Sequence, residues 1–492
     1  MPLIGDDEID LGIIKKRSLA GVVSLISRSF LIHVISLVST LLLTVFLDPK
    51  IFGIFFLVSA FINFFSYFSD IGLAAALIQK KSQVTDEDLK TTFTVQQFLV
   101  LALLVLIIGL TPLIRRFYGL SQPASGLIYA LGISLFLSSL KTIPSVLLER
   151  SLKFDFLVIT QIVETLVFNV LAVVLAWRGF GITSFTVAVL ARSVIGLVLI
   201  YLLSPWKIGL SFSRESLSHL LRFGLPYQVN TIIAVLKDDL MTVYLGKVIG
   251  TTGLGYLGWG KKWAEQPLRF FMDNVLKVTF PAYARIQDDK KSLAQAVEKS
   301  IFFLTFLTFP FLIGLSIMAK DLVSLIPRYQ KWTPALVPLY LYCFNSALAV
   351  ISTVTTNIFN AIGKIKTTFK LMIMWLVLTW VLMPFLGIKY GYIGVAWSTA
   401  LIACSSIVPV ILAKREIQFS LTASVFKPFL ASALMGAAIF ILKSKIPPTP
   451  LGIFLVVILG GLSYLFFSYL LFGRVLFKDL KKILMHFKRG KN

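Results

Sequence analysis

Residues 253–283 read GLGYLGWGKKWAEQPLRFFMDNVLKVTFPAY. The stretch is long enough to cross a bilayer as one helix, since a helix rises about 1.5 Å per residue and the hydrocarbon core is about 30 Å thick. It nevertheless carries charges of alternating sign at four-residue spacing, here termed the charge ladder: Lys261, Glu265, Arg269, Asp273 and Lys277. Residues four apart share one helical face. Because a charge facing lipid is costly, we expect this face to be turned toward water or protein.

Two explanations of the charge ladder remain open at the level of sequence. Charges kept inside a membrane usually line the path of a substrate, which indicates a transporter with a charged cargo. Alternatively, neighbouring charges four residues apart neutralise each other as ion pairs inside a helix bundle. The first explanation predicts that the charges contact the cargo, and the second predicts only a structural role.

The composition places the chain among polytopic membrane proteins. Of its 492 residues, 57% are hydrophobic and only 14% are charged, which is not typical of a soluble globular domain. Apolar segments of helix length recur along the chain and predict an all-α polytopic membrane protein with about 14 transmembrane helices. The predicted spans are 18–46, 51–79, 92–113, 124–148, 155–177, 181–203, 222–249, 253–283, 297–319, 335–361, 367–386, 391–413, 424–443 and 451–472.

The net charge of +24 comes from 47 Lys and Arg residues against 23 Asp and Glu. With the N-terminus in the cytoplasm, most basic residues fall in inner loops and tails, as the positive-inside rule requires. This distribution favours a multi-pass protein of the cell inner (cytoplasmic) membrane, with both termini cytoplasmic and no nucleic-acid partner. Residues 473–492 are predicted to form a basic amphipathic tail on anionic lipid.

Sequence motifs for catalysis, metal binding and nucleotide hydrolysis are not found. The chain has no GxxxxGK[ST] pattern, and its three histidines are widely scattered. Cys343 and Cys404 fall in separate apolar segments, which predicts neither a disulfide nor a metal site. We therefore expect no cofactor and no metal, and energy supplied by the cargo or by H⁺ or Na⁺ coupling.

A repeated turn indicates that the chain has two related halves. Leu47-Asp48-Pro49-Lys50-Ile51-Phe52-Gly53-Ile54-Phe55 precedes the second span, and Ile249-Gly250-Thr251-Thr252-Gly253-Leu254-Gly255-Tyr256-Leu257 precedes the eighth in matching register. An even number of spans per half predicts two six-helix lobes related by pseudo-two-fold symmetry around a central cavity. Chance similarity between apolar sequences is the alternative. The predicted parts are a cytoplasmic N-terminal tail (1–17), an N-lobe (18–203), a cytoplasmic linker (204–221), a C-lobe (222–413), two C-terminal helices (424–472) and the basic tail (473–492).

Several short motifs, in order along the chain, resemble those of a known transporter family. They include the repeated turn, Ser69-Asp70-Ile71-Gly72-Leu73, the segment from Leu147 to Phe154, Phe223-Gly224-Leu225-Pro226, Phe280-Pro281-Ala282, Gln330-Lys331-Trp332 and Asn360-Ala361-Ile362-Gly363-Lys364. Together they resemble the polysaccharide and lipid-linked oligosaccharide flippases (Wzx type) of the multidrug/oligosaccharidyl-lipid/polysaccharide superfamily. The resemblance covers nearly the whole chain and is more specific for the superfamily than for the cargo.

Two further positions match the lipid II flippases of the same superfamily. Ser27-Arg28 matches a Ser-Arg pair in their first span, and Lys262, five residues before Pro267, matches a basic residue in their eighth. An arginine of their second span is not reproduced, since that region here is Phe61-Ile62-Asn63-Phe64-Phe65. This departure argues against lipid II itself as the cargo.

The resemblance and the intramembrane charges together give candidate substrate-binding residues. Arg and Lys suit a pyrophosphate headgroup, because they replace its hydration with charge-assisted hydrogen bonds. Interleaved acids would keep the headgroup from binding too tightly. The candidates are Arg28, Arg192, Lys237, Lys261, Lys262, Glu265, Arg269 and Asp273.

Four other carboxylates are candidates for ion coupling: Asp70, Glu164, Asp238 and Asp239. Glu164 lies near the middle of its predicted span, where a carboxylate is costly, and it either binds a proton or pairs with Arg28 or Arg192. Asp70 lies near a span end, and its alternatives are a helix cap or a pair with Lys80 or Lys81.

The sequence therefore predicts a flippase that moves an undecaprenyl-pyrophosphate oligosaccharide across the cytoplasmic membrane by alternating access, for cell-surface polysaccharide biosynthesis. Its expected partners are this lipid-linked oligosaccharide, membrane lipids, and a polysaccharide polymerase and glycosyltransferases of the same process. A cation-coupled multidrug exporter of the superfamily is the nearest alternative. A membrane glycosyltransferase or polymerase is a third, disfavoured because the short outer segments offer few carboxylates for catalysis. We expect the protein not to be an enzyme.

Overall fold

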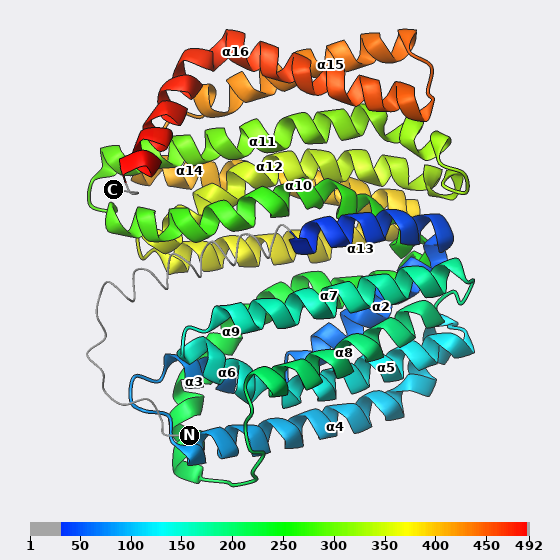
Figure 1. The fold of residues 1–492 in the computed structure, drawn as a ribbon, viewed down its shortest axis with the longest axis vertical. Coiled ribbons are helices and arrows are strands. Elements are labelled where there is room, and N and C mark those ends of the chain that lie inside the picture. The colour runs from blue at the N-terminus through cyan, green and yellow to red at the C-terminus, as the bar shows by residue number, and fades with distance from the viewer. Residues whose placement is uncertain (1–30, 490–492) are drawn as a thin grey trace. The chain divides into compact units, whose positions relative to one another are not determined.

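The computed structural model describes residues 31–489, and every regular element in this range is a helix (Figure 1). After the helix Leu31–Phe46, the elements are α2 (Pro49–Ser66), α3 (Leu73–Gln79), α4 (Asp86–Tyr118), α5 (Gln122–Leu140), α6 (Thr142–Arg150), α7 (Phe154–Trp177), α8 (Thr183–Leu203), α9 (Arg214–Val248), α10 (Gly250–Arg285), α11 (Lys290–Leu325), η1 (Gln330–Ala335), α12 (Leu336–Ala361), α13 (Ile365–Cys404), α14 (Ile407–Glu416), η2 (Thr422–Phe426), α15 (Lys427–Lys445) and α16 (Pro450–Arg489).

Within this range, ten helical segments are long and apolar enough to cross a membrane, and Leu31–Phe46 is a shorter apolar helix. Helices α9 and α10 have the required length, with 35 and 36 residues, but they carry more charge than the ten. The predicted class, an all-α polytopic membrane protein, is confirmed. The count of fourteen spans and the pseudo-two-fold symmetry stay predictions.

Local sequence signals fix several helix ends. The Thr85 side chain accepts a hydrogen bond from the Asp88 amide while Asp88 bonds back to the Thr85 amide, a capping box that begins α4. Asp289 begins α11 as a simple cap, since its side chain accepts hydrogen bonds from the amides of Lys291 and Ser292. Hydrogen bonds from the Ser292 side chain and amide hold the pKa of this exposed carboxyl below its usual range. Gly391, at φ 62°, joins the two straight parts of α13, which matches the predicted boundary between spans 367–386 and 391–413.

The predicted single span 51–79 is instead two helices. Helix α2 ends at Ser66 and α3 begins at Leu73, because Ile71 and Gly72 adopt left-handed backbone angles, with φ of 50° and 78°. A β-branched residue at positive φ is strained, and the surrounding packing must hold it there. The sequence showed Gly72 but gave no signal for Ile71.

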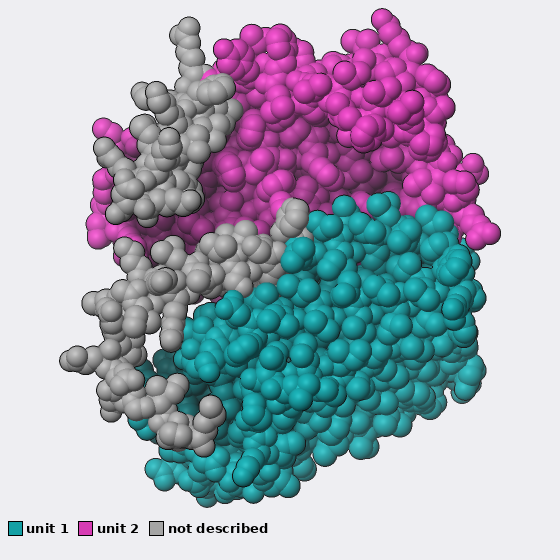
Figure 2. Space-filling view, in the orientation of Figure 1, with its two compact units in different colours: residues 1–255 teal, residues 256–492 magenta. Residues whose placement is uncertain are grey.

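The chain divides into two compact units, residues up to Gly255 and residues from Tyr256 (Figure 2). In the first unit α8 packs against α5 and α7, α4 packs against α5, and α9 packs against α2, α3 and α4. A buried cluster around Leu77, Phe93, Ile143 and Leu220 joins α3, α4, α6 and α9. Helix α9 thus lies with the first unit; the predicted lobe boundaries at 203 and 222 stay predictions.

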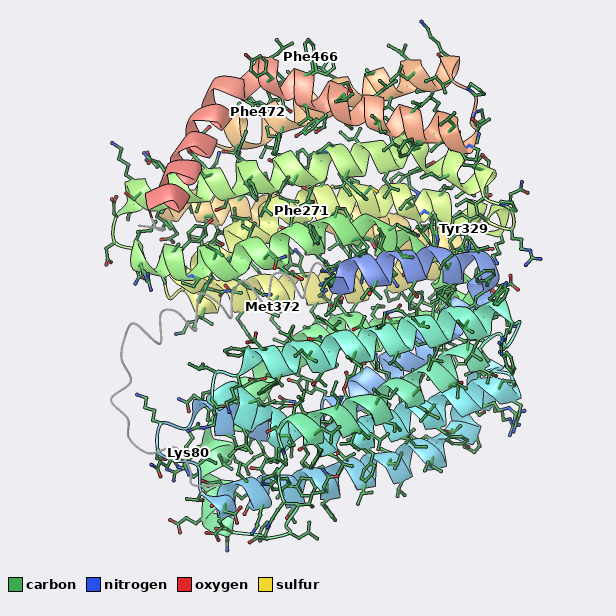
Figure 3. All side chains as sticks on the ribbon, in the orientation of Figure 1. Lys80, Phe271, Tyr329, Met372, Phe466 and Phe472 are labelled. Carbon is green, nitrogen blue, oxygen red and sulfur yellow. The ribbon has the colours of Figure 1, made fainter. Side chains whose placement is uncertain are left out.

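In the second unit α12 packs against α11, α13 and α14 around a core that includes Val297, Val354 and Leu371. Helices α15 and α16 pack against each other and against α11. Phe472 is buried in this contact whereas Phe466 is exposed (Figure 3). Helix α16 kinks at Phe472, directly before the predicted basic tail begins.

The two copies of the repeated turn touch each other within the first unit. A Cβ atom added to Gly53 would lie 1.6 Å from the carbonyl oxygen of Thr251, and one added to Gly255 would lie 1.9 Å from that of Pro49. The contact is therefore reciprocal and made by backbone alone. Glycine is required at both positions because any side chain would push the two turns apart.

Candidate functional site

The first three residues of the charge ladder, Lys261, Glu265 and Arg269, form a shared ion-pair group on α10. Glu265 Oε1 lies 3.9 Å from Lys261 Nζ, and Glu265 Oε2 lies 3.3 Å from Arg269 Nη2. The Glu265 side chain is 18% exposed, against 46% for Lys261 and 59% for Arg269. One inward carboxylate thus orients two cations whose donors remain accessible within the second unit.

The last two residues of the charge ladder, Asp273 and Lys277, do not continue this series of ion pairs. Asp273 and Lys277 are exposed and form no ion pair with any residue in the described range 31–489. If the charge ladder had only a structural role, each of its charges would form an ion pair with an opposite charge four residues away. The geometry instead leaves charges of both signs available along the exposed face of α10.

Lys262 lies next to the ladder and has no hydrogen bond or ion pair with other residues of the described range. Its side chain is partly buried. Pro267, five residues later, lies inside α10 and lacks the amide that would bond the carbonyl of Trp263. A partly buried ammonium group without a partner is expensive, which favours an anionic ligand for Lys262.

Tyr342 of α12 lies beside the charge ladder, and the sequence did not identify it as a candidate. This buried side chain of α12 lies near enough to Lys261 and Glu265 to interact with both electrostatically. It therefore connects the charged face of α10 with α12. The only sequence signal was a tyrosine within an apolar segment, which is common.

In the first unit, Glu164 of α7 pairs with Lys141 at 2.5 Å, and both side chains are less than one-fifth exposed. The predicted partner Arg192 interacts electrostatically with Glu164 and places its guanidinium 5.3 Å from the ring centre of Phe168. The other proposed partner, Arg28, lies outside the described residues. Lys141 was missed because nothing in the sequence connects it to a residue of the next span.

A cavity of about 450 Å³ opens beside this pair. Its lining is Lys141, Ser145, Glu149, Phe154, Leu157, Thr160, Gln161, Glu164 and Ile200. Burial raises the pKa of the Glu149 carboxyl. Gly196 of α8 makes room for the Glu164 carboxylate, since a Cβ there would lie 1.7 Å from Glu164 Oε1.

We expect Lys141→Ala to destabilise the protein by about 1–3 kcal/mol, because Glu164 would remain partly buried without its ammonium partner. Thermal unfolding in detergent should show a lower midpoint for Lys141→Ala and little change for Lys153→Ala, an exposed lysine at the start of α7. Adding Glu164→Ala should restore part of the loss. If the double variant were as unstable as the sum of both single ones, the ion pair would not be the cause.

The other ion-coupling candidates have protein partners. Both carboxylate oxygens of Asp70 lie 3.2 Å from the Ala74 amide, which is the helix-capping alternative, and Lys80 pairs with Asp88 instead at 2.6 Å. Asp238 pairs with Lys237 at 2.7 Å.

Asp239 accepts a long hydrogen bond of 3.5 Å from the Asn63 side chain. Asn63 and Asp239 belong to α2 and α9, so this contact joins two helices of the first unit. The roles of all these residues in transport stay predictions.

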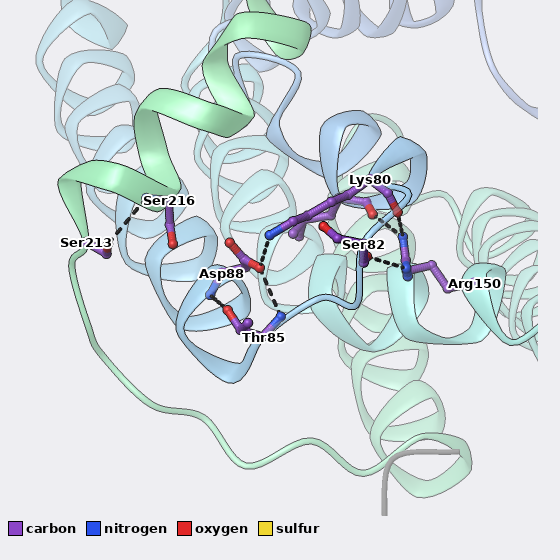
Figure 4. A network of polar contacts seen from close by, with 8 residues as sticks. Lys80, Ser82, Thr85, Asp88, Arg150, Ser213 and Ser216 are labelled. Atoms are coloured by element: carbon purple, nitrogen blue, oxygen red, sulfur yellow. Dashed lines mark hydrogen bonds and ion pairs between the residues drawn. The ribbon is translucent and has the colours of Figure 1, made fainter. Parts of the chain in front are cut away.

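Arg150 organises one end of the first unit (Figure 4). Its guanidinium donates to the carbonyls of Leu77, Ile78 and Lys80 at 2.7, 3.2 and 2.9 Å. It thus satisfies carbonyls at the C-terminal end of α3. This explains structurally why an arginine stands in the segment from Leu147 to Phe154.

A family model described as polysaccharide biosynthesis protein matches residues 42–337, more than half of the chain. The chain belongs to this family. The match covers the first unit from the end of the helix Leu31–Phe46 onward and extends through the charge ladder. The superfamily resemblance predicted from short motifs is confirmed.

Two relatives illustrate what the chain is similar to. It is 25% identical over 376 residues to an uncharacterized membrane protein in the cps region of Klebsiella pneumoniae, covering 75% of this chain and 76% of the relative. It is 28% identical over 165 residues to the lipopolysaccharide biosynthesis protein WzxC of Escherichia coli (strain K12), covering 34% and 33%.

The fold is similar to that of a solved structure, the lipid II flippase MurJ in an inward closed conformation. The TM-score is 0.75 at 18% sequence identity, over 92% of this chain and 99% of the other. The chain is thus a multi-pass membrane protein with a MurJ-like fold.

Proposed function

We propose that this protein is a flippase that carries an undecaprenyl-pyrophosphate oligosaccharide across the cytoplasmic membrane by alternating access, for the assembly of a cell-surface polysaccharide. The observation that carries the proposal is the arrangement on α10, where Glu265 holds Lys261 and Arg269 with accessible donors. Two neighbouring cations suit the two phosphates of such a lipid, because charge-assisted hydrogen bonds replace phosphate hydration.

The names of the relatives support the same cargo class. WzxC is described as a lipopolysaccharide biosynthesis protein, and the structural neighbour MurJ as a lipid II flippase. The accessible bases of α10 and the unpartnered Lys262 speak against a multidrug exporter for cationic drugs, which would need acids and aromatic groups at this face. We also propose that the protein is a transporter and not an enzyme.

For energy coupling we propose the Lys141–Glu164 pair of the first unit. Its carboxylate is mostly buried, sits beside a cavity and is held by a single ammonium group at 2.5 Å. A proton arriving at Glu164 would neutralise the carboxylate and release Lys141 for an anionic headgroup, so that proton uptake and cargo binding would favour each other. Na⁺ is the other candidate ion, and Asp238 and Asp239 are further candidate carboxylates.

Reconstituted protein tests the proposed function directly. Vesicles containing the protein and a fluorescent undecaprenyl-pyrophosphate oligosaccharide should expose added substrate to an outer-leaflet reagent faster than protein-free vesicles. Vesicles loaded with a cationic dye should show no protein-dependent efflux. Dye efflux without lipid movement would favour the multidrug alternative and overturn the proposal.

The proposed orientation, with both termini cytoplasmic in the inner membrane, predicts a labelling pattern. Single cysteines at Ser121 or Lys389 should react with an impermeant maleimide in intact cells, whereas those at Ser213 or Lys366 should react only after the membrane is opened. The measurement is the labelled fraction before and after permeabilisation. Labelling of Lys366→Cys in intact cells would contradict the predicted topology.

A further inference from the structure

Residues 205–213 connect α8 to α9 as an extended segment without helical structure, here termed the strap. Figure 4 shows the chain reaching Ser213 as an open coil before α9 begins. Its apolar side chains alternate with small or polar ones: Ile208, Leu210 and Phe212 are 58%, 75% and 63% exposed. Alternate residues of an extended chain point in opposite directions. One edge of the strap is therefore apolar and uncovered.

The strap is fixed to the first turns of α4. The amide of Ser211 donates to Thr94 Oγ1 at 3.1 Å, and the amide of Ser213 donates to Thr91 Oγ1 at 3.1 Å. These two bonds lie two residues apart and so maintain the extended register. The apolar edge is thus a fixed feature of the first unit.

Side-chain packing adds two more attachments. The ring of Trp206 packs edge-on against Phe93 with centroids 5.1 Å apart. The aliphatic stem of Lys90 covers Gly209, where an added Cβ would lie 2.5 Å from Lys90 Cε. Trp206 has the same parity as Ile208 but packs against α4, so the alternation of exposed apolar side chains applies from Ile208 to Phe212.

The attachment to α4 also sets the depth of the strap. Helix α4 is one of the candidate spans, and its exposed apolar side chains begin just after the attachment, with Phe98 at 73%, Leu101 at 47% and Val105 at 71% exposed. This face of α4 suits lipid. Irregular backbone exposed to lipid does not occur inside the hydrocarbon core, because its amides would lack partners. The strap therefore lies outside the hydrocarbon core, next to the point where the apolar face of α4 begins.

We propose that the strap is an interfacial membrane anchor: Ile208, Leu210 and Phe212 insert into the adjoining lipid leaflet, and Lys207 and Arg214 at its ends contact anionic headgroups. The lipid occupant follows from continuity with the apolar face of α4 and from the two exposed basic residues that flank the apolar edge. This inference is independent of the cargo, since it concerns how the first unit is held against the bilayer while α9 begins beside it.

Site-specific fluorescence tests the anchor in the full-length protein. Cys343 and Cys404 are replaced by alanine, and single cysteines are placed at Ile208, Leu210 and Phe212. Each variant is labelled with an environment-sensitive dye in nanodiscs that contain anionic lipid and a spin-labelled lipid quencher near the headgroup. The matched control carries the cysteine at Ser211, whose side chain is half-buried and whose amide is bound to Thr94.

The expected result is a period of two along the strap. Quenching should be about twofold stronger at the three apolar positions than at Ser211, because alternate side chains differ in their immersion. Equal quenching at all four positions, or water-like emission without quenching at the apolar ones, would overturn the anchor. If adding soluble host protein to the nanodiscs abolished the quenching, the apolar edge would bind protein in preference to lipid. This outcome would also reject the proposal. None of these outcomes changes the expected movement of lipid-linked substrate.

Discussion

Exchanging the charges of the α10 pair, by Glu265→Arg together with Arg269→Glu, should leave a folded protein that no longer exports polysaccharide. The exchange keeps an ion pair between positions 265 and 269, but it loses the pair with Lys261 and sets like charges at positions 261 and 265 and at 269 and 273. Each such pair changes stability by a few tenths of a kcal/mol, so the total loss should stay at about 1 kcal/mol. The exchange moves the positive charge by about 6 Å along the helix. If Arg269 contacts a phosphate, losing that bond costs about 1.5–3 kcal/mol, which is about 10- to 100-fold in rate.

The measurements are polymer at the cell surface in a strain without its own flippase, and the unfolding midpoint of the purified variant. Lys262→Ala should show the same loss of export, and Lys366→Ala, at an exposed lysine near the start of α13, should not. If the exchanged variant exported polysaccharide normally at normal abundance, the charge ladder would have only a structural role. In that case the proposed headgroup contact would be withdrawn.

Adding one methyl group at the repeated turn should have the largest effect on stability. A Cβ at Gly53 would lie 1.6 Å from the Thr251 carbonyl oxygen, so Gly53→Ala must separate the N-terminal ends of α2 and α10. Overpacking of this kind typically costs about 1–3 kcal/mol. We expect a clearly lower unfolding midpoint in detergent and loss of export.

Gly109→Ala is the matched control, because Gly109 lies inside α4 with no atom within 4 Å of an added Cβ. Alanine is the better helix former by about 1 kcal/mol, so this change should be neutral or stabilising. Gly255→Ala should resemble Gly53→Ala, and the two together should lose less than the sum, because either one already separates the turns. Two fully additive losses would show that the turns act independently.

Composition and periodicity were sufficient for the fold class. The alternation of apolar segments and charged loops predicted a polytopic helical protein, and the four-residue spacing from Lys261 to Arg269 placed their charges on one face, where the structure has them. Even the junction at Gly391 followed from a glycine between two apolar runs. These features depend on local sequence, which determines helix faces and helix ends.

Contacts between distant segments could not be predicted in the same way. Glu164 was a reasonable candidate, but its partner Lys141 depends on how α7 packs near the junction of α5 and α6, and a single sequence carries no such information. The position of Tyr342 beside the charge ladder also depends on tertiary packing. So does the end of the helix at Ile71, whose positive φ angle is disfavoured by local backbone preference. In each case tertiary packing overrides or supplements the local preference.

The reciprocal contact of Gly53 with Thr251 and of Gly255 with Pro49 has a consequence for how such chains diverge. When two side chains touch, a larger one on one side can be offset by a smaller one on the other. Here each glycine faces a carbonyl group, which every amino acid possesses and no substitution removes. Neither half of the chain can therefore accommodate a change at this position in the other half. We expect homologues to drift freely around these turns while both glycines persist together, or are lost together with the turn.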